Sequence, residues 1–151
     1  MPNPEPVLGQ FIGGEFRDSS VDGRLASWNP SRPEEVVARA PIGSGEDVDL
    51  AVGAASAAVS GWSGQTGAAR AEALARWAER IEARAEEAAL LMAREVGKPL
   101  AEAKGEAARC AAILRYFAGE AVRGNGQVIP AQIPSTLQFT WRKPLGVVGL
   151  V

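Results

Sequence analysis

Two strand patterns, separated by a proline, occupy the C-terminal end of the chain. From Thr136 to Arg142 apolar and polar residues alternate, which predicts a strand with one buried face. After Pro144, residues 145–151 (LGVVGLV) are apolar on both faces, as is typical of a strand inside a sheet that helices cover. Such a strand needs a neighbour on each edge and a cover on each face. The pattern therefore predicts a fold that is interrupted at the end of this sequence.

Three segments in the middle of the chain have helical periodicity. The first begins after Ser44, a hydroxyl N-cap that is followed three residues later by the acid Asp47. Its apolar positions recur at helical spacing until Ser60-Gly61, where we expect the helix to end. Trp62 is then expected to pack just beyond that end.

The second and third segments predict a pair of packed helices. The second is capped near Thr66, keeps one apolar face at steps of three and four, and ends at Gly97. The third begins with Pro99 in its first turn, and its apolar line of mostly small side chains includes Cys110. It ends at the glycines of residues 124–126. Because small side chains allow a close approach, we expect the two helices to pack antiparallel.

Short strands and turns fill the N-terminal part of the chain. The pattern around Gly13-Gly14 predicts a small hairpin over residues 11–17, after a loose lead-in over residues 1–9. The Asn29-Pro30 pair predicts a turn, and residues 35–40 (EVVARA) predict a further short strand. With the helices, these elements indicate an α/β protein.

Composition and charge narrow the classes of partner. The 151 residues carry a net charge of −2 and hold no run of Lys or Arg suited to a nucleic-acid backbone. The sequence has no apolar window of about eighteen residues that could cross a membrane, and its start lacks the pattern of a signal peptide. The single cysteine cannot form an internal disulfide. The sequence has no histidine, so the commonest general base is absent. We therefore expect a soluble, cytoplasmic protein with neither a nucleic-acid nor a membrane partner.

Cys110 is the only candidate thiol nucleophile. It lies on the apolar line of the third helix, and the neighbouring cations Arg109 and Arg115 point elsewhere around that helix. A nucleophilic cysteine needs exposure and a lowered pKa, whereas cysteine is among the residue types most often buried. We expect Cys110 to fill the core, and the alternative is a reactive thiol.

Two other groups of residues invite a functional interpretation. Gly146-Val147-Val148-Gly149 has two glycines of the dinucleotide fingerprint, but they lie within a predicted strand and no helix follows them. Close packing is the simpler explanation of these glycines. Four carboxylates could form acid–base pairs, but a helix cap, first-turn charge and a solvated face explain them better: Glu46, Asp47, Glu102 and Glu106. The residues themselves thus indicate no catalytic group and no cofactor-binding group.

The order of several segments along the chain is specific enough to compare with known families. These segments are FIGGEF at 11–16, the Asn29-Pro30 turn, EVVARAPIGSGEDVDLAV at 35–52, Trp62, REVGKPLAEAKGE at 94–106, LRYFAGEA at 114–121 and RKPLGVVGLV at 142–151. This ordered set resembles the N-terminal part of the NAD(P)-dependent aldehyde dehydrogenase superfamily. The resemblance covers nearly the whole chain from Phe11 on. Within the superfamily, the last two segments look most like the 2,5-dioxovalerate (α-ketoglutarate semialdehyde) dehydrogenases.

The resemblance implies an α/β fold that is incomplete in this chain. Its parts would be a small β hairpin, a helical hairpin, the start of an oligomerisation tongue and the first strand of a dinucleotide-binding sheet. The implied boundaries are a loose N-terminus at 1–9, the N-terminal part of the dinucleotide-binding domain at 10–135, the tongue strand at 136–143 and the first sheet strand at 144–151.

The resemblance also implies an activity for the complete protein. Members oxidise an aldehyde to a carboxylic acid with NAD or NADP, through a cysteine thiohemiacetal, and the complete protein is expected to be a homo-oligomer. In the family, the cofactor loops, the general base and the nucleophile follow the region matched here, so Cys110 is not that nucleophile. We expect the chain alone to be inactive and to bind no cofactor. The alternative is a stand-alone interaction module that docks on full-length aldehyde dehydrogenase subunits.

One site that the resemblance implies lies within this chain. Some members bind a structural monovalent cation near the Asn-Pro turn and near the acid that precedes Gly-Lys. The matching residues here are Ser27, Trp28 through its carbonyl, and Glu95, where some members have Asp. Hard cations prefer such oxygen ligands.

Overall fold

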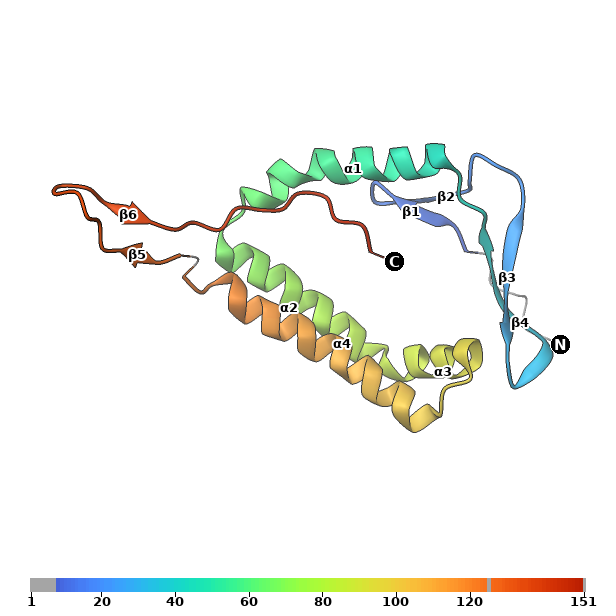
Figure 1. Ribbon diagram of the computed structural model, residues 1–151. Helices are drawn as coiled ribbons and strands as arrows, with labels where there is room; N and C mark the ends of the chain where they lie inside the picture. The colour runs from blue at the N-terminus through green and yellow to red at the C-terminus, as the bar shows by residue number, and fades with distance from the viewer. Residues whose placement is uncertain (1–7, 125, 151) are drawn as a thin grey trace.

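The computed structural model describes residues 8–124 and 126–150 (Figure 1). The loose lead-in expected over residues 1–9 lies outside the described residues up to Val7, as does the residue Asn125 of the expected helix stop. In chain order the elements are β1 (Gln10–Ile12), β2 (Glu15–Arg17), β3 (Arg24–Asn29), β4 (Arg32–Pro41), α1 (Gly45–Ser63), α2 (Gly67–Ala83), α3 (Ala85–Val96), α4 (Leu100–Ala121), β5 (Val128–Ile129) and β6 (Gln138–Phe139). This arrangement confirms the expected α/β class.

The described strands form three separate antiparallel pairs: β1 with β2, β3 with β4, and β5 with β6. The first pair is the predicted hairpin, and its turn uses Gly13 and Gly14 at φ 65° and 90°, where glycine meets no Cβ penalty. The strand expected over residues 35–40 is confirmed but is longer, because β4 pairs with β3 along most of its length. Strand β3 is not predicted by the sequence pattern, because its side chains do not alternate cleanly between apolar and polar.

The N-terminus of α1 is held by a carboxylate that also fixes the preceding loop. Ser44 and Asp47 form the predicted capping box: the Asp47 backbone N–H donates to Ser44 Oγ at 3.1 Å, and the Ser44 N–H donates to Asp47 Oδ2 at 2.9 Å. The Ser19 hydroxyl donates to the same oxygen at 2.6 Å, and the Ser20 N–H reaches Oδ1 at 3.2 Å. Asp47 is therefore buried, with 5% of its surface exposed. The helix continues to Ser63, so the expectation that it ends at Ser60-Gly61 with Trp62 beyond it is wrong.

Asp47 predicts an acid-dependent loss of stability. The Ser19 hydroxyl and the backbone N–H groups around it hold the pKa of the Asp47 carboxyl far below its ordinary 3.8. Because the folded pKa is depressed, the ionised form stabilises the fold fully above pH 3.8, and this stabilisation is lost as the pH falls towards the folded pKa. We expect Asp47→Asn to flatten the decline of the urea midpoint below about pH 5. Equal slopes in the two proteins would contradict this assignment, and comparing them removes the contribution of the other acids.

The long helix expected from Thr66 to Gly97 is broken into α2 and α3. Arg84 has φ −116° and ψ 16°, outside the helical region, and its guanidinium binds the Glu87 carboxylate at 2.8 and 2.6 Å. The ends are as predicted: the Thr66 hydroxyl accepts from the Ala69 N–H at 3.2 Å, and Gly97 closes α3 at φ 73°. The prediction of a single helix is therefore wrong. The sequence pattern does not reveal the break, because the apolar periodicity continues through it.

The helical pair is confirmed, and its seam is made of alanine. Helix α4 packs against both α2 and α3 (Figure 1), and its fully buried positions are Ala103, Ala107 and Ala111, at steps of four. Cys110 is exposed, so its expected place in the core is wrong. One residue along a helix is a rotation of about 100°, which turns Cys110 away from the line that ends at Ala111.

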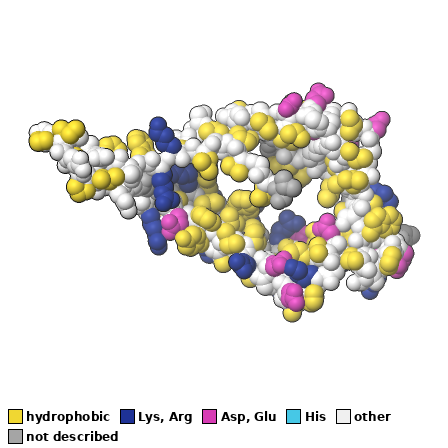
Figure 2. Space-filling view, viewed as in Figure 1, with side chains coloured by type: hydrophobic (Ala, Val, Ile, Leu, Met, Phe, Trp, Pro, Cys, Tyr) yellow, Lys and Arg dark blue, Asp and Glu magenta, His cyan; other side chains and the backbone are white. Residues whose placement is uncertain are grey.

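The described residues after α4 leave the helices and are mostly exposed. β5 and β6 form a projecting arm, residues 126–140, and the chain then returns between α1 and α2 (Figure 1). Of the strand predicted over 136–142 only Gln138–Phe139 is paired, and residues 145–150 of the second predicted strand have no regular structure. Figure 2 shows an opening between α1 and the helices below it, with hydrophobic side chains along its edges. No described helix is long and apolar enough to span a bilayer.

Candidate functional site

The turn of the β3–β4 hairpin meets the C-terminal end of α3 and brings two of the predicted cation ligands together. The Ser27 hydroxyl donates to Glu95 Oε1 at 3.2 Å across 68 positions of sequence. Trp28 lies beside them, where the β3–β4 register shifts on both sides of this residue. Such a bulge leaves backbone groups outside the regular ladder, which suits a carbonyl ligand.

A second polar network lies next to this pair and was not expected from the sequence. Asn29 is buried, with 5% of its surface exposed, and its side-chain amide donates to Glu35 Oε2 at 2.8 Å. The Arg94 guanidinium donates twice to Glu35 Oε1, at 2.6 and 2.9 Å. Arg94 first and Asn29 second hold the pKa of the Glu35 carboxyl below its ordinary value. The sequence indicated only the Asn-Pro turn of this network. The pairing of Glu35 with Arg94 could not be predicted, because the two residues are 59 positions apart.

The remaining candidate carboxylates do not form an acid–base pair. Asp47 is occupied by the α1 cap, and Glu46 lies beside it in the first turn of the helix. Glu106 pairs with Lys98, and Glu102 lies in the first turn of α4. Among the described residues, no three His, Cys, Asp or Glu side chains gather where they could hold a metal ion. A cation at the hairpin would therefore depend on hydroxyl and carbonyl oxygens as well as on Glu95.

Gly146 and Gly149 lack the surroundings of the glycine-rich dinucleotide fingerprint in the described residues. A Cβ added to either glycine would meet nothing within 4 Å, so open space surrounds both glycines. Within the described residues no helix follows this segment to present its N-terminus to a pyrophosphate. The described residues around these two glycines thus do not show the strand–turn–helix arrangement of the fingerprint.

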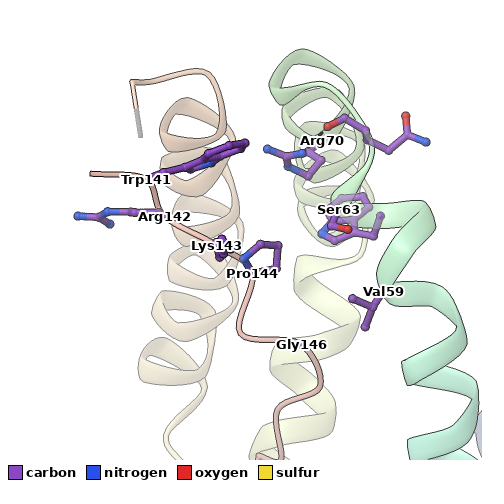
Figure 3. Close-up of a pocket in the computed structure, with 10 residues that line it drawn as sticks. Val59, Ser63, Arg70, Trp141, Arg142, Lys143, Pro144 and Gly146 are labelled. Atoms are coloured by element: carbon purple, nitrogen blue, oxygen red, sulfur yellow. Dashed lines mark hydrogen bonds between the residues drawn. The ribbon is translucent and has the colours of Figure 1, made fainter. Parts of the chain in front are cut away.

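A pocket of about 510 Å³ lies where the returning segment crosses the junction of α1 and α2 (Figure 3). Trp141 points towards Arg70 across it, and Arg142 and Lys143 add further positive charge. Arg70 also donates to the Gln65 carbonyl at 2.5 Å. The lining residues include Ser63 and Lys143 but no carboxylate, cysteine or histidine, so the pocket offers neither a thiol nor a carboxylate base.

Comparisons with known proteins agree on one family. The sequence model of the aldehyde dehydrogenase family matches residues 16–151. The α-ketoglutaric semialdehyde dehydrogenase of Bacillus subtilis is 45% identical over 141 residues, which cover 93% of this chain and 29% of that protein. Aminoaldehyde dehydrogenase 2 of Zea mays is 38% identical over 99% of this chain and 31% of its own length. The chain thus spans about three tenths of these relatives.

Solved structures give the same answer for the fold. An NAD-dependent aldehyde dehydrogenase from Sinorhizobium meliloti superposes with a TM-score of 0.83 at 32% identity, covering 90% of this chain and 28% of that one. An aldehyde dehydrogenase from Brucella melitensis biovar abortus 2308 has a TM-score of 0.85 at 34% identity, over 89% of this chain and 28% of that one. The small hairpins and the four helices therefore form the N-terminal part of this fold. The chain belongs to the aldehyde dehydrogenase family.

Proposed function

We propose that this chain is the N-terminal part of an NAD(P)-dependent dehydrogenase that oxidises an aldehyde to a carboxylic acid. The observation that carries the proposal is the family match over residues 16–151 together with coverage of only 28–31% of the compared relatives and structures. In this proposal residues 10–135 belong to the dinucleotide-binding domain, residues 136–143 to the oligomerisation tongue and residues 144–151 to the first strand of the sheet. The complete protein is a cytoplasmic homo-oligomer.

The proposed substrate is an aldehyde that carries a carboxylate, with α-ketoglutarate semialdehyde as the first choice. The Bacillus subtilis relative is named for that aldehyde, and other relatives are named for the succinate, glutarate and aspartate semialdehydes. The chemistry requires a thiolate that attacks the aldehyde and a nicotinamide that accepts hydride. In this proposal the thiolate and the groups that bind the nicotinamide come from residues other than those of this chain.

The chain alone is expected to show no aldehyde dehydrogenase activity. The test is the absorbance of NADH or NADPH at saturating cofactor and α-ketoglutarate semialdehyde, with the 151-residue chain verified by mass. The matched control is the complete Bacillus subtilis relative under the same conditions. Aldehyde-dependent reduction of cofactor by the chain alone would refute the proposal that the catalytic and cofactor-binding groups lie outside this chain.

We also propose that Ser27, the Trp28 carbonyl and Glu95 bind a monovalent cation. The Ser27 and Glu95 oxygens lie 3.2 Å apart, so one hard cation can contact both of them. A cation that binds only the folded state raises its stability. We expect KCl to raise the thermal midpoint of the chain above that in equimolar tetramethylammonium chloride.

Glu95→Gln is expected to remove this difference between the two salts. Glu102→Gln is the matched control, because it removes one exposed carboxylate from a helix that does not contribute to the site. If Glu95→Gln keeps the full response to potassium, or if Glu102→Gln loses it equally, the cation does not bind at the hairpin.

A second candidate function is an interaction module that docks on aldehyde dehydrogenase subunits. The observation that favours it is the large exposed apolar surface, which includes Trp141 at 74% and Leu150 at 98%. Specific co-purification of the monodisperse chain with a complete subunit would support this function, and aggregation of the chain would count against it.

A further inference from the structure

The pocket next to the arm has walls from two distant parts of the chain. One wall is the junction of α1 and α2, which contributes Trp62, Ser63 and Arg70, and the other is the segment of residues 141–146. In Figure 3 the side chains of Trp141 and Arg70 point towards each other across the open space between these walls. The volume of about 510 Å³ is in the range of small-molecule sites.

The charged side chains that line this pocket are all positive: Arg70, Arg142 and Lys143. Within the described residues, none of them forms an ion pair with a carboxylate. Arg70 donates to the Gln65 carbonyl, and a guanidinium has further N–H donors for a second acceptor. Figure 2 shows Lys and Arg side chains gathered where the arm joins the helices. The pocket therefore favours an anion.

The aromatic side chains of the pocket narrow the class of anion. Trp62 and Trp141 both line it, and they expose 49% and 74% of their surface. An exposed indole is a surface on which a nucleobase stacks, and the planar guanidinium of an arginine is another. Trp141 and Arg70 provide one such surface on each side of the same space. A flat ring that carries negative charge matches this arrangement better than a bare inorganic anion does.

We propose that this pocket binds a nucleoside phosphate, with the base between Trp141 and Arg70 and the phosphates beside Lys143. Arg142 extends away from Arg70 in Figure 3, so it contributes through its charge rather than by holding the base. NAD fits less well, because both of its phosphates are bridging and it has no terminal phosphate with a second negative charge. The site is separate from the cation site at the hairpin, and it does not depend on dehydrogenase activity.

The test is titration of the 151-residue chain with ADP, followed by tryptophan fluorescence and by calorimetry. We expect ADP to quench the fluorescence and to bind about 10-fold more tightly than inorganic pyrophosphate, which has no ring to stack. ADP should also bind more tightly than NAD, and its affinity should fall as KCl rises, because salt screens exposed charges. Absence of ADP binding, or equal binding of pyrophosphate or NAD, would overturn the proposal.

A pair of tryptophan variants tests the stacking surface. Trp141→Leu is expected to weaken ADP binding by about 5- to 100-fold, the range that the loss of one stacked base gives. Trp77→Leu is the matched control, because Trp77 is also largely exposed but does not line this pocket. Both variants should keep the helical circular dichroism of the unsubstituted chain. Equal affinities of the two variants for ADP would overturn the assignment of the base to Trp141.

A second pair of variants separates the pocket from general charge attraction. Lys143→Gln is expected to weaken ADP binding by about 2- to 5-fold at low salt. Arg109→Gln removes the same charge from an exposed position of α4 that does not line the pocket, and we expect it to leave the affinity unchanged. If both variants lose affinity equally, ADP is attracted by the overall charge and the pocket is not its site.

Discussion

Replacing Gly97 by alanine is expected to lower the free energy of unfolding by about 2–5 kcal/mol. Gly97 ends α3 at φ 73°, a left-handed conformation that costs a residue with a Cβ about 1–2 kcal/mol. An added Cβ would also lie 2.8 Å from Cγ of Pro30, in the turn of the β3–β4 hairpin. The proline ring cannot rotate away, so the hairpin itself must shift, at a further cost of about 1–3 kcal/mol.

The control for Gly97→Ala is the same substitution at Gly105, in the middle of α4. A Cβ there meets nothing within 4 Å, and alanine is favoured over glycine in a helix by about 1 kcal/mol. The two variants should therefore shift the urea midpoint in opposite directions. If Gly97→Ala is neutral, the close approach of Pro30 to the helix end does not exist in solution.

The same substitution should also weaken cation binding at the hairpin. Moving Pro30 away from α3 would carry Ser27 away from Glu95, and their oxygens are only 3.2 Å apart. We expect Gly97→Ala to reduce the stabilisation by potassium as well as the midpoint measured without it. Gly105→Ala should leave the potassium response unchanged.

Local signals in the sequence predicted the starts of α1 and α2 and the end of α3, but not the ends of α1 and α4. A cap depends on residues within one turn of each other, so Ser44 with Asp47, Thr66 and Gly97 could all be identified without a structure. The break at Arg84 was missed, because the apolar face continues across it and the residue that turns the chain is neither glycine nor proline. Periodicity therefore identified the helical residues but not the number of helices.

Interactions between distant parts of the chain could not be predicted from the sequence pattern alone. The Glu35–Arg94 pair and the Ser27–Glu95 contact join the hairpin to a helix about sixty positions away. Only the second was expected, and only through a family resemblance. Cys110 was misplaced for a different reason: an apolar line with mixed steps of three and four leaves its central residues ambiguous by one position.

Replacing Ala107 by leucine is expected to lower the free energy of unfolding by about 1–3 kcal/mol. Ala107 is 3% exposed on the face of α4 between Ala103 and Ala111, and each of these neighbours is at most 1% exposed. A seam of alanine lets helices approach closely, so three extra carbons there must push α4 away from α2 and α3. The Arg115–Glu82 ion pair spans α2 and α4 at 3.0 and 2.5 Å, but both side chains are nearly half exposed and can offset little of this cost.

Ala108→Leu gives the matched comparison, because it adds the same carbons one position along the same helix. Ala108 is exposed, and leucine and alanine are both strong helix formers, so we expect a change within about 0.5 kcal/mol. Urea unfolding followed by helical circular dichroism measures both variants. Equal effects of the two substitutions would mean that Ala103, Ala107 and Ala111 do not form the contact face of the helical pair. A large effect confined to Ala107→Leu would show that the alanine seam fixes how closely the helices pack, as the steps of four along α4 require.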